Sequence, residues 1–447
     1  MESFEEALDA LVEMGPSGIA RFQESLDLQW VDEALEATGK ASTRRRKLPA
    51  EQAVWLVLGM ALFEDRSIEA VVDHLDLVLP GVGSLAPSAV TQARYRLGPE
   101  PLEALFHRVA DAWADSPGLG GYRGLSLHAV DGTCMRVQDT DENFEFFGKP
   151  GGRSGPSDAG YPQLRLAALL NLSTRLLSDV RFGPYTVGEQ TLAAELWAKL
   201  PPKSLTILDR GFVNYAVFAS LLDRGEDRHI LVRMRANMKP RFTKKLPDGS
   251  WLATLDPSTN ARADNPDIRS EIRGRVIGYE HPGGKPGQLF TTLTDHEEYS
   301  SPELIELYHD RWEIELAFDE LKTHMHERRE SLRSKKPEGV QQEVWGLLLV
   351  YNLVRREMLL AAEEHGLEPK RISFRNALMW IRNCWLIAWQ TKPGNIPKHL
   401  GQLRSTLDIL ILPERRSKRR YPRHVKIKMS KFKRNRGKRT PPAEVAN

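Results

Sequence analysis

The stretch LSLHAVDG (residues 125–132) predicts a buried β-strand that ends on an acid, Asp131, followed by glycine. A second stretch, LTILDRGF (residues 205–212), repeats the pattern and places Asp209 directly after four strand-forming residues. The carboxyl ends of strands in an α/β sheet meet at one edge, where polar side chains form binding sites. Taken alone, either aspartate also fits a turn or helix-cap position. The pair, more than either residue, indicates a site.

A third acid lies on a helix that is predicted to begin at Ser301, with Pro302 in its first turn. At about 100° per residue, four polar side chains of this helix share an arc of about 60°. They are Tyr308, Arg311, Glu315 and Lys322. The arc borders the apolar stripe of the same helix, so Glu315 is able to face the edge of the sheet. An ion-paired surface helix is the alternative, since Arg311 and Glu315 are four residues apart.

The regions around these acids differ in character. Helical apolar spacing predicts an N-terminal helical domain over residues 1–118, which either binds DNA or caps the core. Residues 119–336 alternate strand-like and helical stretches, which is typical of a mixed α/β core, and residues 238–294 within them form a β-rich insertion. A helical region over 337–413 and a basic tail over 414–447 follow.

The strands expected in the core, before the insertion, are bounded by Gly, Pro or Asp and alternate with helices in its second half. The strands are residues 125–133, 163–172, 175–182, 204–209 and 229–234, and the helices are residues 189–200 and 215–223.

The net charge of +3 conceals an uneven distribution. Of the 63 basic residues, 14 lie between Arg415 and Arg439 without any acid, which leaves 49 against 59 acidic residues up to Glu414. Such a block is either a solvated terminus or an arm that binds nucleic acid through its phosphates. A second, smaller basic cluster consists of Arg44, Arg45, Arg46 and Lys47.

Several other classes of protein are excluded. Two cysteines, Cys134 and Cys384, are too few for a disulfide scaffold and too far apart in sequence for a Cys-x-x-Cys zinc site. The longest apolar runs, residues 53–63 and 344–354, are shorter than the ~20 residues that cross a bilayer. The first residues are acidic and unlike a secretion signal. We therefore expect no membrane partner and a cytoplasmic location.

The placement of the three acids resembles the DDE transposases of bacterial insertion sequences. The residues that carry the resemblance are Asp131 in VDGT, Asp209 in LDRGF, and the Tyr-x2-Arg-x3-Glu-x6-Lys motif from Tyr308 to Lys322. This spacing is that of the subgroup founded on insertion sequence four. The resemblance covers most of the chain and implies an α/β fold with a ribonuclease-H-like core, the β-rich insertion, a helical N-terminal domain and a helical, basic C-terminal region.

The resemblance implies that Asp131, Asp209 and Glu315 bind two Mg²⁺ ions, with Mn²⁺ as a possible substitute. Three carboxylates without His or Cys suit such hard cations, and two ions are typical of phosphodiester cleavage and transfer. Water would free a 3′-OH at the element end, and this hydroxyl would attack target DNA. Tyr308, Arg311 and Lys322 would hold phosphates.

Arg210 and the cluster from Arg44 to Lys47 are further candidates for DNA contacts. The implied partner is double-stranded DNA, both element ends and target, bound by a homodimer near the bacterial nucleoid. Two other functions stay open: a nuclease or nickase of the same fold that lacks strand transfer, and a non-catalytic DNA-binding protein derived from an element.

Overall fold

A computed structural model describes residues 26–42, 48–75, 77, 85–114, 121–150, 160–236, 238–280, 286–327, 329–388 and 411–412. The chain divides into two compact units, residues 1–411 and 412–447, and the elements below belong to the first. The basic cluster at Arg44 to Lys47 and the basic tail lie outside the described residues.

The described N-terminal region is helical. Its helices are α2 (Leu28–Ala37), α3 (Ala50–Leu62), α4 (Ile68–His74), α5 (Pro87–Leu97) and α6 (Glu100–Ala114). Helix α3 is buried along nearly its whole length, because α2, α5 and the long C-terminal helix α13 (Pro337–Glu364) pack around it. The N-terminal helices are therefore joined to the rest of the first unit by a shared apolar core.

Within the described residues, nine strands form one mixed sheet in the order β3-β2-β1-β4-β5-β9-β8-β7-β6. The strands are β1 (Ser126–Arg136), β2 (Gln163–Asn171), β3 (Leu177–Pro184), β4 (Ser204–Leu208), β5 (Arg228–Arg233), β6 (Arg241–Lys245), β7 (Trp251–Leu255), β8 (Ile272–Tyr279) and β9 (Gly287–Thr291). The first five confirm the five strands predicted for the core. The prediction of a mixed α/β fold with a large sheet is confirmed.

The direction of the strands places the two aspartates at one edge. Strand β1 runs antiparallel to β2 and parallel to β4, and β4 runs parallel to β5. Val130 pairs with Leu208 in the register, so Asp131 and Asp209 follow neighbouring positions on adjacent strands. The strand pairing confirms that the two acids lie at the same end of the sheet.

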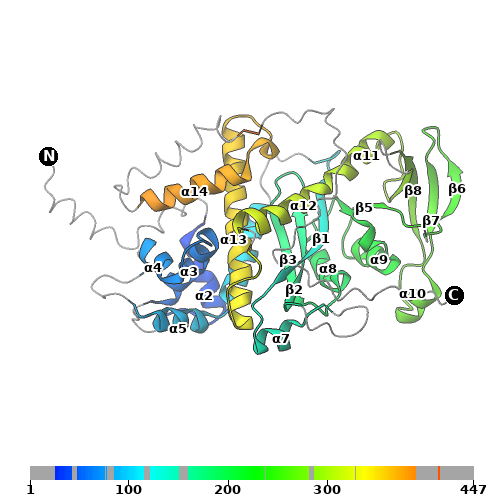
Figure 1. Cartoon of the computed structure of the whole chain (residues 1–447). Helices are drawn as coiled ribbons and strands as arrows, with labels where there is room; N and C mark the ends of the chain where they lie inside the picture. Colours follow the sequence, from blue (N-terminus) through cyan, green and yellow to red (C-terminus); the bar gives the residue numbers. More distant parts are fainter. Residues whose placement is uncertain are drawn as a thin grey trace, which may run out of the picture. The chain divides into compact units, whose positions relative to one another are not determined.

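The β-rich insertion continues this same sheet. Strand β9 pairs antiparallel with β5, and β8, β7 and β6 follow outward by antiparallel pairing. A short helix, α10 (Thr259–Asp264), connects β7 to β8. Figure 1 shows β6, β7 and β8 at the end of the sheet that is far from α13.

Helices cover both faces of the sheet. Helices α8 (Glu189–Leu196) and α9 (Tyr215–Asp223) pack on one face, where Val130 and Leu208 are buried. The other face carries Leu127 and Ala129 and is covered by helices that include α12 (Trp312–Asp319) and α13. Figure 1 shows α13 between the N-terminal helices and the sheet.

The helix predicted to begin at Ser301 does not continue unbroken to Lys322. Helix α11 (Ser301–Asp310) gives way to α12 at Arg311, and residues 320–325 form a π-helical turn. The described residues between this turn and Pro337 are not helical; Pro337 begins α13, and Phe374 begins α14 (Phe374–Ala388). Proline at the first turn suits a fresh start because it lacks the amide hydrogen that a preceding turn would use.

None of the helices in the described part of the chain is both long and apolar enough to span a membrane.

Candidate active site

Asp131 lies near the middle of β1 rather than at its end, where the sequence predicted it, because residues 131–136 continue to pair with β2. It comes immediately after the residues that pair with β4. Its Oδ1 accepts a hydrogen bond of 2.8 Å from the amide of Gly132. Asp209 caps the short helical turn that follows β4, and its Oδ1 accepts hydrogen bonds from the amides of Gly211 and Phe212. The helix-cap alternative considered from the sequence is thus realised for Asp209, and it leaves the second carboxylate oxygen, Oδ2, without a part in the cap.

Glu315 approaches β1 from α12, on the face of the sheet toward which Asp131 points. Side chains alternate between the two faces along a strand, so Asp131 shares the face of Ala129, against which α12 packs. Arg311 joins the two acids: its Nη2 donates a hydrogen bond of 2.8 Å to Glu315 Oε1, and its Nη1 lies 3.7 Å from Asp131 Oδ2. Arg311 and Glu315 form the predicted ion pair, and through Arg311 this pair also contacts Asp131 of β1.

Burial controls the charge state of Asp131. Burial raises the pKa of this carboxyl to about 7, the hydrogen bond from Gly132 opposes the rise, and the negative charges of Asp209 and Glu189 add to it. Arg311 lowers the pKa by a smaller amount. A further positive charge near this carboxyl would lower its pKa and favour the ionised form.

Lys322 also contacts β1, although the π-helical turn rather than a regular α-helix carries it. Its Nζ donates a hydrogen bond to Thr133 Oγ1, two residues beyond Asp131 and on the same face of the strand. Burial lowers the pKa of Lys322. Tyr308 is buried at the end of α11, and its pKa is raised by burial and lowered by the neighbouring Arg311. All four residues of the predicted motif therefore lie on the face of the sheet that carries Asp131.

A fourth acid, Glu189, was not among the predicted site residues. It begins α8 on the opposite face of β1, and a Cβ atom added to Gly132 would clash with its side chain. Burial and the charge of Asp209 raise its pKa. One sequence feature could have identified Glu189: it follows Gly188 at the start of a helix that comes after a core strand. Glycine at position 132 is explained by this close approach.

Arg210, another of the predicted DNA contacts, is exposed next to Asp209.

The predicted donor set fits a hard divalent cation in its chemistry, because all three of its members, Asp131, Asp209 and Glu315, are carboxylates. In the part of the chain that the structure describes, no three His, Cys, Asp or Glu side chains are close enough to hold a metal ion in this conformation. The guanidinium of Arg311 lies between Asp131 and Glu315. In this structure a positive charge of the protein itself therefore lies between the two acids.

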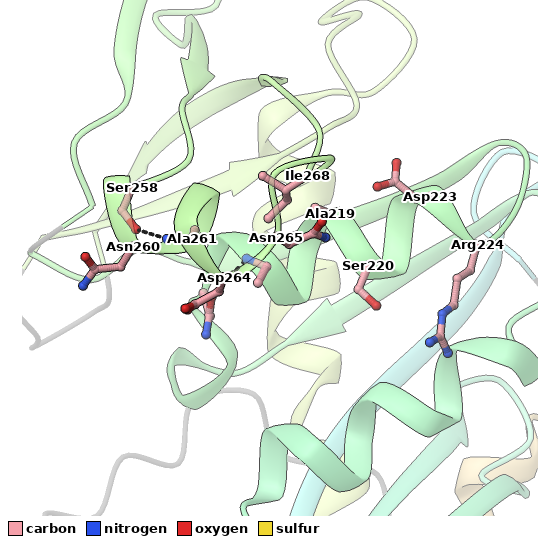
Figure 2. Close-up of a pocket in the computed structure, with 12 residues that line it drawn as sticks. Ala219, Ser220, Asp223, Arg224, Ser258, Asn260, Ala261, Asp264, Asn265 and Ile268 are labelled. Atoms are coloured by element: carbon pink, nitrogen blue, oxygen red, sulfur yellow. Dashed lines mark hydrogen bonds between the residues drawn. The ribbon is translucent and has the colours of Figure 1, made fainter.

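A separate groove of about 460 Å³ lies between α9 and α10, and none of the predicted acids lines it. Figure 2 shows Ser258, Asn260 and Asp264 around α10, and Asp223 and Arg224 at the end of α9. Ser258 Oγ accepts a hydrogen bond of 3.1 Å from the amide of Ala261, which caps α10. Ser258 thus serves the local structure as the cap of α10.

Comparison with known proteins gives consistent matches along the chain. Residues 16–107 match the family described as insertion element 4 transposase N-terminal, and residues 122–353 match the transposase DDE domain. The chain is 35% identical over 409 residues to transposase InsG for insertion sequence element IS4 of Escherichia coli (strain K12), which covers 91% of this chain and 92% of the relative.

Two further similarities cover 49% and 89% of the chain. The putative transposase InsZ of Escherichia coli (strain K12) is 34% identical over 223 residues, which are 49% of this chain and 73% of the relative. A solved structure of the piggyBac transposase synaptic complex with hairpin DNA has a TM-score of 0.43 and 11% identity, and the match covers 89% of this chain and 86% of that chain.

Proposed function

Because the chain belongs to the IS4 family of insertion-sequence transposases, we propose that it cleaves the ends of its element and joins the freed 3′-OH to target DNA. The observation that carries this proposal is the meeting of Asp131 and Glu315 at Arg311, beside the strand that ends at Asp209. The order β3-β2-β1-β4-β5, with the first three strands antiparallel, supports a ribonuclease-H-like core.

Asp131, Asp209 and Glu315 would hold two divalent cations, Mg²⁺ or Mn²⁺. When bound, such ions activate the attacking oxygen and stabilise the leaving oxygen of a phosphodiester. The raised pKa of Asp131 supports this role, because a cation favours the ionised form. Arg311 would leave the two carboxylates when the ions enter and would then be free to contact a phosphate.

The remaining side chains would hold DNA by its backbone. Arg311, Lys322 and Arg210 carry positive charge beside the carboxylates, and Tyr308 lies next to Arg311. Contacts of this kind position a phosphate without reading sequence. The cluster from Arg44 to Lys47 is proposed to add contacts from the N-terminal region.

The partners proposed are double-stranded DNA, at both element ends and at the target, and a second copy of the chain when two ends are held. A bacterial, nucleoid-associated location goes with such a substrate.

The test of the proposal is cleavage of a labelled element end by Asp209→Asn in Mg²⁺. We expect cleavage to be lost while binding of the end is retained, because the change removes a charge and keeps the shape. Asp264→Asn is the matched control, since Asp264 is an exposed acid on α10, outside the site. Full activity of Asp209→Asn would overturn the assignment.

The same assay separates the alternatives. A pre-cleaved end with a free 3′-OH should be joined to target DNA by the wild-type chain. Cleavage without joining would indicate a nuclease or nickase, and binding without either reaction would indicate a non-catalytic DNA-binding protein.

A further test concerns the tail. Deletion of residues 415–447 should flatten the salt dependence of binding for element ends and random DNA alike, because fewer phosphates would be neutralised. An unchanged slope would contradict a DNA-binding role for this segment.

A further inference from the structure

The segment that carries Glu315 and Lys322 also carries two buried acids, Glu313 and Glu320. Each lies two residues before one of the site residues. Side chains two apart on a helix point to nearly opposite sides, so the buried acids face into the protein while Glu315 and Lys322 face β1. The segment thus has an outer, candidate catalytic side and an inner, charged side.

Each inner acid meets a buried arginine from a distant part of the chain. Arg175, in the turn between β2 and β3, forms an ion pair with Glu313, and its Nη1 lies 3.8 Å from Glu320 Oε1. Arg355, on α13, forms an ion pair with Glu320. The two arginines thus bind the segment on both sides of the point where α12 passes into the π-helical turn.

The arginines are themselves fixed by α13. Tyr351 donates a hydrogen bond of 3.0 Å to the carbonyl of Arg175 and accepts one of 3.3 Å from Nε of Arg355. Asn352 exchanges two hydrogen bonds of 2.9 Å with the backbone of Leu177, the first residue of β3. One helix therefore holds the turn that carries Arg175 and also supplies Arg355.

Buried ion pairs are an inefficient source of stability, because removing two charges from water costs about as much as their attraction returns. Their distinctive property is direction, since a planar guanidinium donates its hydrogen bonds to a carboxylate in only a few geometries. The segment needs such direction, because α-helix ends at Asp310, resumes at Trp312 and changes to a π-helix at Glu320. Irregular joints of this kind leave its rotation to tertiary contacts.

We propose that Arg175 and Arg355 are positioning residues that, through Glu313 and Glu320, fix the rotation at which Glu315 and Lys322 face β1. This inference rests on the proposed function, because it assigns a purpose to the orientation of Glu315. Loss of one pair should let the segment rotate and should weaken metal binding at the outer side.

The test measures Mn²⁺ affinity of the full chain without DNA, by titration calorimetry, for Glu320→Gln and for Glu343→Gln. Glu343 is the matched control, because it is an equally buried acid near an arginine, Arg94, but lies on α13 away from the catalytic segment. We expect Glu320→Gln to weaken Mn²⁺ binding about 10-fold or more, as is usual for residues that orient metal ligands. Glu343→Gln should lower the melting temperature comparably and leave Mn²⁺ affinity unchanged.

Equal Mn²⁺ affinities in the two variants would overturn the proposal. If Glu320→Gln does not fold, Glu313→Gln replaces it with the same two outcomes. Binding of an element end, which we expect to be retained, verifies that the variant is folded. Asp209→Asn separates this inference from the proposed function. Retained cleavage in that variant would contradict the proposed function. Lost cleavage in Asp209→Asn, together with equal Mn²⁺ affinities of Glu320→Gln and Glu343→Gln, would contradict only the positioning role.

Discussion

Replacing Asp131 by Asn should stabilise the metal-free protein at alkaline pH. Burial and neighbouring acids raise the pKa of this carboxyl from 3.8 to about 7. The folded chain therefore binds more protons than the unfolded chain between these two values, and its stability falls as pH rises through that window. The difference corresponds to roughly 4 kcal/mol once the carboxyl is fully ionised in both states. Asn has no proton to lose and avoids this cost.

The gain should depend on pH in a defined way. At pH 8 it approaches the full roughly 4 kcal/mol, and at pH 5 it shrinks to about 1.5 kcal/mol, because the folded carboxyl is then protonated and only the unfolded chain is ionised. The pKa of about 7 already includes the opposing effect of Arg311. For a chain of this length, about 1 kcal/mol moves the melting temperature by about 1–2 °C. We expect a rise of about 4–8 °C at pH 8 and about 2 °C at pH 5.

The assay is thermal unfolding in EDTA at pH 5, 6, 7 and 8, with Asp264→Asn as a control that should show no such trend. A second arm adds Mg²⁺, which should stabilise the wild-type chain more than the Asn variant, because a ligand bound only by the folded state stabilises it by mass action. A stability difference that does not vary with pH, or an Asn variant that melts earlier at pH 8, would refute the reasoning.

Three further predictions concern packing and contact with β1. Gly274→Ala should lower the stability by at least about 1–3 kcal/mol, because a Cβ there would clash with the Phe290 ring and with a backbone carbonyl; Gly278→Ala on the same strand, which meets nothing within 4 Å, should not. Asn352→Ala should cost about 2–4 kcal/mol by chemical denaturation, since it leaves two buried backbone groups of β3 unpaired. Lys322→Met should slow cleavage of an element end by up to about 100-fold, while the melting temperature changes by only a few degrees. The reason is that methionine keeps the apolar stem of the side chain and removes the buried charge. An unchanged cleavage rate would contradict a role for the ammonium group.

The strands that carry the two aspartates could be predicted because each begins with an apolar run, although β1 continues past Asp131 to Arg136. Leu127 and Ala129 face one core and Val130 faces the other, so β1 is buried on both sides and its apolar run is nearly continuous. The motif from Tyr308 to Lys322 identified the helix for a similar reason, since its spacing is local. Such features depend on residues close in sequence.

The features that escaped prediction depend on distant residues. The π-helical turn at Glu320 is held by Arg355, which lies 35 positions away. Glu189 reaches the site because Gly132, on another element, leaves room for it. The insertion could be recognised as β-rich, but its attachment to β5 through β9 involves strands some 60 positions apart. Spacing within one element carries no information on such pairings.

The continuity of the sheet through the insertion has a consequence for dissecting this protein into parts. Strand β5 hydrogen-bonds to β4 on one side and to β9 on the other. A minimal core made by excising residues 238–294 would leave β5 with a row of unpaired amides and carbonyls, which invites pairing with another chain. Phe290 and Val276, which are buried beside Leu255, would be removed with it. Residues 238–294 therefore belong to the same sheet as the carboxylates. Aggregation of a shortened chain would show that the edge of β5 is exposed, and would say nothing about catalysis.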